Sequence, residues 1–176
     1  MKKSLLFILV FIGSYFVGLG QDQAAAHFVA AREYYKNNEL AKAQLELDSA
    51  LRINPKYAEA HWLLANIAEQ EDDLSLAMKQ LSETIVNDPT LAEAYAERAA
   101  LHYKMQDHQN YIISDIENAI YLKPDNVEYY RLKGFYYAHT LAYGEMYPSY
   151  NKDISTLTAA LAMDSDNAEL YFDRGN

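Results

Sequence analysis

A repeat of 34 residues is the feature of this sequence that most limits its possible folds. Asn54-Pro55 and Ala58-Glu59-Ala60 return 34 residues later as Asp88-Pro89 and Ala92-Glu93-Ala94. Each copy continues into a run with apolar residues at helical spacing. Pro then ends each unit, because it disfavours helical geometry in the residue before it. A period of this length predicts stacked helical hairpins.

The period divides the chain into hairpins, each with a leading and a returning helix. The expected repeats cover residues 24–57, 58–91, 92–126 and 127–167, with a partial fifth repeat at 168–176. In the first repeat we expect helices over 24–36 and 40–53, joined by a turn at 37–39. The third repeat has one extra residue, placed near 106–110, and the fourth has about seven, around 143–149. Together they form one repeat domain over 21–176.

Small residues mark the point where the two helices of each hairpin are expected to cross. Two helix backbones come within about 8–10 Å at such a crossing, and large side chains do not fit there. The leading helices carry Ala31, Ala65, Ala99, Gly134 and Gly175, and the returning helices carry Ala50, Thr84, Ala119 and Ala160. Both series keep step through the two insertions. We therefore expect these side chains to be buried.

Residues 24–176 resemble the tetratricopeptide repeat family, whose unit of 34 residues is a helical hairpin. The residues that match the family pattern are Tyr34, Tyr137, Ala43, Ala77, Pro55, Pro89 and Pro124. The residues that depart from it are His27, His61, Tyr95 and Tyr130 at the usual Trp, with Ile112, Asp153 and Ser165 at other sites. The resemblance implies an all-α solenoid of stacked helix-turn-helix repeats that forms a right-handed superhelix.

In this family the leading helices line the concave groove of the superhelix and bind other proteins there. The resemblance places the following residues in the groove: Phe28, Arg32, Tyr35, Lys36, Trp62, Asn66, Glu69, Gln70, Tyr103, Lys104, Arg131, Phe135 and His139. Aromatic residues and Arg often dominate the energy of protein interfaces. The set predicts a scaffold that binds an acidic or mixed peptide of another protein. Trp62 has an alternative interpretation as a core residue after a small shift in register.

Two other functions stay open at this stage. Residues 168–176 begin a leading helix that has no returning helix, so the repeats are alternatively the N-terminal region of a longer enzyme or signalling protein. An uncovered terminal repeat is also adhesive, which allows a self-assembling structural protein. Tyr143, Tyr147 and Tyr150 form either a binding lip or a cover over the hairpin end.

Residues for catalysis or metal binding do not form a recognisable pattern. The five His residues lack the one-turn spacing of a zinc helix, and no phosphate-binding loop or nucleophile elbow is present. The segment 164–167 resembles the start of a calcium loop, but Ala168-Glu169 stands where that loop requires Gly. We therefore expect no enzyme, no catalytic residue, no metal and no cofactor.

The N-terminus has the pattern of a secretory signal peptide, residues 1–20. Lys2 and Lys3 precede an apolar run that ends at Gly18-Leu19-Gly20, and the run is shorter than a membrane-spanning helix. We expect an exported protein, periplasmic or secreted, with an uncleaved membrane anchor as the alternative. Cleavage removes two positive charges and no negative one, so the net charge of −10 becomes −12. Such acidity disfavours nucleic acid and anionic membranes as partners.

Overall fold

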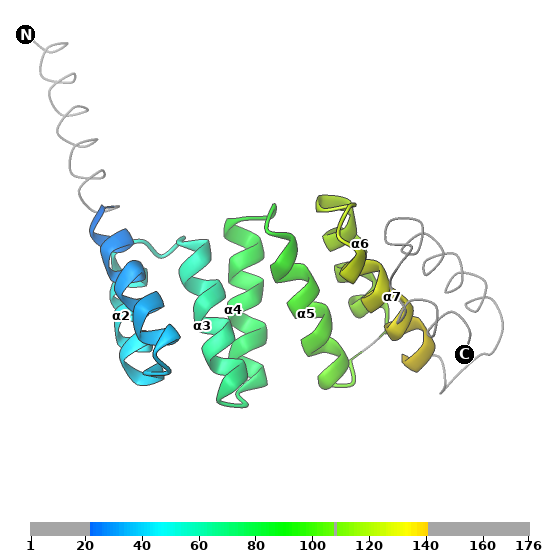
Figure 1. The fold of residues 1–176 in the computed structure, drawn as a ribbon, viewed down its shortest axis with the longest axis horizontal. Coiled ribbons are helices and arrows are strands. Elements are labelled where there is room, and N and C mark those ends of the chain that lie inside the picture. The colour runs from blue at the N-terminus through cyan, green and yellow to red at the C-terminus, as the bar shows by residue number, and fades with distance from the viewer. Residues whose placement is uncertain (1–21, 108, 141–176) are drawn as a thin grey trace, which may run out of the picture. The chain divides into compact units, whose positions relative to one another are not determined.

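The computed structural model describes residues 22–107 and 109–140 of the chain. The predicted signal peptide, the fourth-repeat insertion and the fifth repeat lie outside these residues. All regular secondary structure in the described part is α-helical (Figure 1). Its helices belong to two compact units, Met1–Asn87 and Asp88–Asn176, called unit 1 and unit 2 below.

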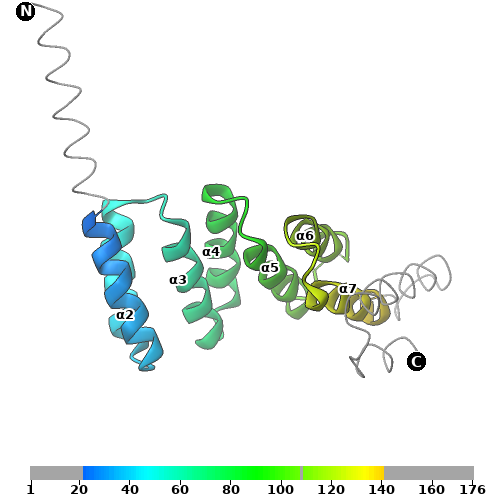
Figure 2. The same cartoon turned by 45° about the horizontal axis from the view of Figure 1, so that its top comes forward.

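Unit 1 contains two helical hairpins. The first pairs a helix over residues 22–36 with α2 (Leu40–Ile53), and the second pairs α3 (Ala58–Gln70) with α4 (Leu74–Asn87). Figures 1 and 2 show α3 and α4 side by side along their whole lengths. These helices coincide, within a few residues, with those expected from the repeat.

Unit 2 contains the third hairpin and the leading helix of the fourth. The third hairpin pairs α5 (Ala92–Lys104) with α6 (Gln109–Leu122), and α7 (Val127–Thr140) packs against α6. The turn between α5 and α6 is one residue longer than the turn between α3 and α4. The extra residue of the third repeat therefore lies in this turn, as predicted.

The turn inside each hairpin contains one residue with left-handed backbone geometry. Asn38, Asp72 and Gln106 have φ angles of 58°, 61° and 57° at equivalent sites of the three hairpins. The backbone N–H of the following residue donates to a carbonyl oxygen five residues earlier, as in Asp73 to Ala68 at 2.9 Å. This pattern closes the helix and satisfies a carbonyl at its end.

The loops before α3, α5 and α7 are each held by a polar atom of an aromatic side chain. His61 Nε2 lies 3.0 Å from the carbonyl oxygen of Pro55, and the hydroxyl of Tyr130 donates to that of Pro124 at 3.0 Å. Tyr95 makes the same contact with Pro89 at 3.4 Å. His61, Tyr95 and Tyr130 therefore each connect a leading helix to the Pro that precedes it.

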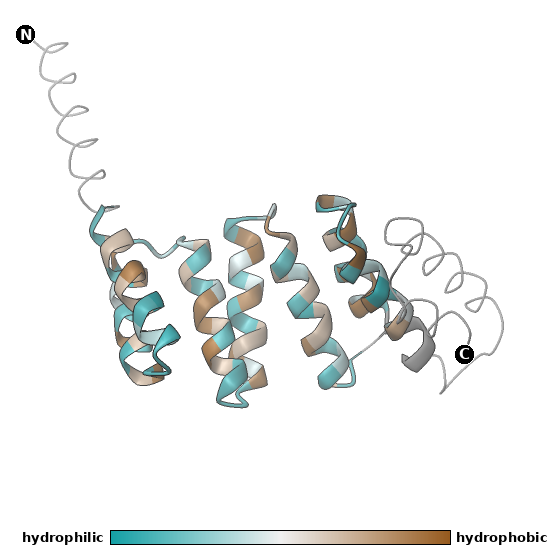
Figure 3. Cartoon of the chain, in the orientation of Figure 1, coloured by the Kyte–Doolittle hydropathy of each residue, from teal (hydrophilic) through white to brown (hydrophobic). Residues whose placement is uncertain are grey.

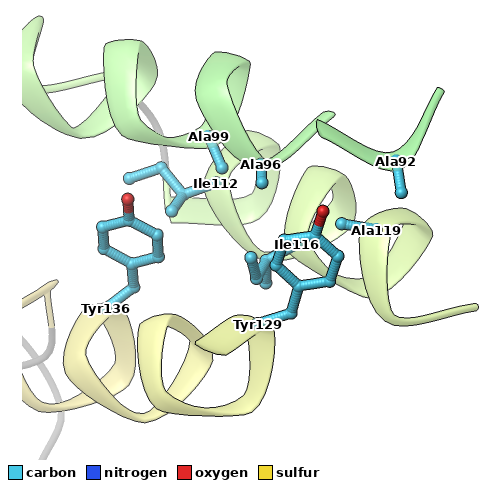
Figure 4. Close-up of a cluster of buried hydrophobic side chains, with 8 residues drawn as sticks. All are labelled: Ala92, Ala96, Ala99, Ile112, Ile116, Ala119, Tyr129 and Tyr136. Carbon is cyan, nitrogen blue, oxygen red and sulfur yellow. The ribbon is translucent and has the colours of Figure 1, made fainter. Parts of the chain in front are cut away.

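The small residues at the helix crossings are buried, as the sequence predicted. The described members of the two series are Ala31, Ala65, Ala99, Gly134, Ala50, Thr84 and Ala119, all buried. In unit 2, Ala99 and Ala119 belong to a cluster of apolar residues contributed by α5, α6 and α7 (Figure 4). Gly175 and Ala160 lie outside the described residues.

Polar and apolar stretches alternate along the helices (Figure 3). This alternation is typical of helices with one face in a core and one in water. Among residues 22–107 and 109–140, no helix combines the length and apolarity that crossing a membrane requires.

Candidate protein-binding surfaces

Eight of the predicted groove residues lie in unit 1, on the helix 22–36 and on α3. These two leading helices contact each other through a hydrogen bond in which Gln70 Nε2 donates to the hydroxyl of Tyr35 at 2.6 Å. The two residues were predicted to share one face. Lys36 is exposed and forms an ion pair with Glu33 on its own helix at 2.8 Å.

Phe28 and Arg32 form the other end of this surface. The guanidinium of Arg32 lies over the Phe28 ring, 6.0 Å from its centroid, and the Phe28 ring packs at a tilt against Tyr57, 5.0 Å away. Phe28 and Tyr57 are partly buried against the core of unit 1, and Arg32 is exposed. Tyr57 was not predicted as a surface residue, because it precedes α3 and falls outside the helical pattern.

Trp62 is partly exposed, and the neighbouring His61 is buried in its place. The exposed fraction of His61 is 9%, and its Nδ1 lies 2.7 Å from the side-chain oxygen of Gln80. His61 therefore occupies the packing site that the family gives to Trp. Trp62 lies on the same helix as Asn66 and Glu69, and its place in the groove stays a prediction.

The four described groove residues of unit 2 lie on α5 and α7. Tyr103 and Phe135 contact each other with ring centroids 5.5 Å apart, and both contact Tyr136, at 5.4 and 5.6 Å. Tyr136 is only 3% exposed, and burial raises its pKa to about 12. The buried Tyr136 ring, which the sequence did not single out, supports two partly exposed rings.

Two basic residues flank this aromatic group. Arg131 Nε donates to a carboxylate oxygen of Glu128 at 2.8 Å, and Lys104 is exposed at the end of α5. His139 also lies on α7, and its side chain is not described. Figure 4 shows Tyr136 and Tyr129 projecting from α7 toward α5 and α6. The opposite face of α7 therefore points away from these two helices.

Polar side chains join the two helices of each described hairpin. His27 Nδ1 lies 2.6 Å from a carboxylate oxygen of Glu46 in the first hairpin, and His61 contacts Gln80 at the equivalent site of the second. In the third, Arg98 Nε and Nη2 donate to the two carboxylate oxygens of Asp115, at 2.8 and 2.7 Å. Periodicity in the sequence gave no sign of these pairs, since their members differ from repeat to repeat.

The third hairpin has a further polar contact next to this pair. His102 Nδ1 lies 2.8 Å from a carboxylate oxygen of Asp107, and its ring stacks on Tyr111 with centroids 5.4 Å apart. The hydrogen bonds from Arg98 to Asp115 raise the pKa of Arg98. His27 and His61 therefore connect the two helices of their hairpins, and His102 connects α5 to the turn that follows it.

A depression of about 600 Å³ lies elsewhere, on the returning helix α2. It is lined by Leu45, Asp48, Leu51 and Arg52, and it contains none of the predicted groove residues. It is wide open to solvent, and Leu45 itself is 64% exposed. This depression is an alternative binding surface, and experiments can distinguish it from the surfaces on the leading helices.

Solved structures share this fold. The sequence matches no protein-family model and no curated protein. The structure is similar to MamA, at 18% identity and a TM-score of 0.75, over 88% of this chain and 80% of MamA. It is also similar to YrrB, described as a TPR protein with an unusual peptide-binding site, at 15% identity and a TM-score of 0.75, over 92% of this chain and 79% of YrrB.

A third similar structure is the first TPR domain of Spaghetti (RPAP3) bound to an HSP90 peptide. It is 16% identical, with a TM-score of 0.63, over 69% of this chain and 95% of that domain. At these low sequence identities, the structural similarity shows only that the fold is shared. The predicted class, all-α with stacked TPR-like helical hairpins, is confirmed. The handedness of the superhelix and the groove stay predictions.

Proposed function

We propose that this chain is a scaffold whose leading helices bind a segment of another protein. The observation that carries the proposal is the pairing of partly exposed aromatic rings with basic residues on leading helices of both units. In unit 1 these are Phe28 and Arg32, and in unit 2 they are Tyr103 and Phe135 beside Lys104. Tyr and Arg are among the residues that most often contribute a large share of the binding energy at protein interfaces. The peptide-binding site of YrrB and the HSP90 peptide bound to the Spaghetti domain agree with this function.

The mechanism that we propose is preorganisation of these surfaces. The Phe28 ring is held by Tyr57, and the Tyr103 and Phe135 rings are held by the buried Tyr136. A side chain that is already fixed loses little conformational entropy when a partner arrives, so more of the contact energy appears as affinity.

We also propose that the scaffold works after export, in the periplasm or outside the cell. The support is the signal-like pattern of residues 1–20. Mass spectrometry of the protein purified from its host is expected to give a chain that begins near Gln21. A chain that retains Met1 and stays in the cytoplasm would contradict export.

The proposed binding surface can be tested with peptides selected from a random dodecapeptide library on the purified repeat domain. We expect a selected peptide to shift backbone amide resonances in the helix 22–36 and α3 of unit 1, or in α5 and α7 of unit 2, because these helices carry the aromatic and basic residues. Shifts confined to α2, around Leu45 and Arg52, would place binding at the depression on that helix and would contradict the proposal.

A further inference from the structure

A hydrogen bond joins the two leading helices of unit 1 at their C-terminal ends. Gln70 Nε2 donates to the hydroxyl of Tyr35 at 2.6 Å, and each residue lies in the last turn of its helix, α3 and the helix 22–36. Both residues were predicted to contact a partner protein in the groove. In the structure their polar atoms contact each other across two hairpins.

A second hydrogen bond holds the same end of α3 from the other helix of the first hairpin. Gln44 Nε2, on α2, donates to a carboxylate oxygen of Glu71 at 2.8 Å, and Glu71 directly follows Gln70. At the N-terminal end of α3, the ring of Tyr57 packs on that of Phe28, with centroids 5.0 Å apart. The helix α3 is therefore attached to the first hairpin near both of its ends.

The repeat position of Tyr35 makes a comparable contact in unit 2. Tyr103 stands at this position in the third repeat, and its ring contacts Phe135 and Tyr136 on α7, with centroids 5.5 and 5.4 Å apart. In each unit, the Tyr at this position connects one leading helix to the next. The contact recurs although its partner residues differ, which indicates a role in spacing the leading helices.

The separation of the two helices matters for the binding surface proposed for unit 1. Phe28 and Arg32 lie on one helix, and Trp62 and Asn66 lie on the other. A segment that contacts both helices needs them at one separation, and its apparent affinity is reduced in proportion to the fraction of molecules that have it. The two hydrogen bonds are exposed, so their loss leaves the apolar core of unit 1 in place.

We propose that Tyr35 and Gln70 are positioning residues, whose hydrogen bond fixes the helix 22–36 and α3 at the separation that a bound segment requires. The inference rests on the proposed function and deepens it, because it assigns these two residues to the spacing of the helices that bind the partner. Affinity then depends on the connection between the two side chains, and a different connection of similar strength can replace it.

Replacing the hydrogen bond by an ion pair separates helix spacing from direct contact with the partner. Tyr35→Phe removes only the hydroxyl, and Tyr35→Glu and Gln70→Lys each remove one half of the bond. The double variant Tyr35→Glu/Gln70→Lys rebuilds the connection between two new side chains. An exposed ion pair and an exposed hydrogen bond have similar net strengths, so the exchange is a fair replacement.

Helix spacing is measured by electron paramagnetic resonance between spin labels at Leu45→Cys on α2 and Lys79→Cys on α4. Both sites are exposed, and the chain contains no native Cys. We expect each single variant to broaden the distance distribution and to weaken binding of a library-selected peptide about fivefold, which corresponds to one hydrogen bond. The double variant should restore both the distances and the affinity.

The matched control is Ser49→Ala, which removes a side-chain hydrogen bond that stays within α2. It should change neither the distances nor the affinity. Unchanged distances or unchanged affinity in the single variants would overturn the inference. A double variant with restored distances that still binds as weakly as the single variants would also overturn it, because Tyr35 and Gln70 would then contact the partner themselves.

Failure of this inference is distinguishable from failure of the proposed function. If library peptides shift only α5 and α7, or bind unit 1 with no dependence on the connection between Tyr35 and Gln70, the scaffold function stands and the positioning role is wrong. If library peptides shift no leading helix, the proposed function fails and the inference fails with it.

Discussion

Replacing Asp115 by Ala is expected to destabilise unit 2 by about 3 kcal/mol, because it removes the carboxylate that pairs with a partly buried guanidinium. Asp115 accepts two hydrogen bonds from Arg98, and the side-chain exposed fractions are 6% for Asp115 and 22% for Arg98. Burying a charge is costly unless it is paired. The loss therefore comes mainly from the uncompensated charge of Arg98 and less from the net energy of the pair.

Urea unfolding followed by circular dichroism measures this change. The matched control is Glu128→Ala, which removes an acidic residue of unit 2 from an ion pair in which the side chains of Arg131 and Glu128 are 30% and 52% exposed. It should cost less than about 1 kcal/mol. The double variant Arg98→Met/Asp115→Leu should recover most of the loss, because no charge is then left buried. A loss for Asp115→Ala no larger than for the control would show that the pair is not buried in solution.

Replacing Ala119 by Leu is expected to cost about 1–3 kcal/mol by overpacking the contact between α5 and α6. Ala119 has no exposed surface, and it lies in the cluster of Figure 4 with Ala99 and Ile116. The three added carbon atoms have no space in a close-packed interior. The helices must move apart or the Leu must adopt a strained rotamer.

The melting temperature of the variant gives the effect directly. Tyr121→Leu is the matched control, because it places Leu two residues later on α6 at a site that is 84% exposed. The control should melt close to the parent protein. If Ala119→Leu melts like Tyr121→Leu, the helix crossing proposed from the series of small residues is in the wrong register.

Most of the helical arrangement follows from the repeat in the sequence. Pro at the end of each unit and small residues at the crossings are imposed by backbone geometry, and they recur wherever that geometry recurs. Ala31, Ala65 and Ala99 are accordingly buried at the same site of three hairpins. The turn residues also recur, since Asn38, Asp72 and Gln106 all have positive φ.

Side-chain contacts that differ between repeats are not predictable in this way. Tyr57 supports Phe28 from a loop, and Tyr136 supports Tyr103 from the next hairpin. Neither contact repeats, so periodicity gives no signal for it. The pair between Arg98 and Asp115 is a further case, because the first two hairpins use His with Glu or Gln for the same purpose.

The affinity of a library-selected peptide for single-residue variants tests the proposed scaffold function most directly. Trp62→Ala and Tyr103→Ala remove partly exposed rings from leading helices, and Tyr121→Ala removes a more exposed ring from the returning helix α6. With helicity unchanged, at least one leading-helix variant should weaken binding about tenfold or more, and Tyr121→Ala should not. Unchanged affinity in both leading-helix variants, with a loss in Tyr121→Ala, would contradict binding through the leading helices.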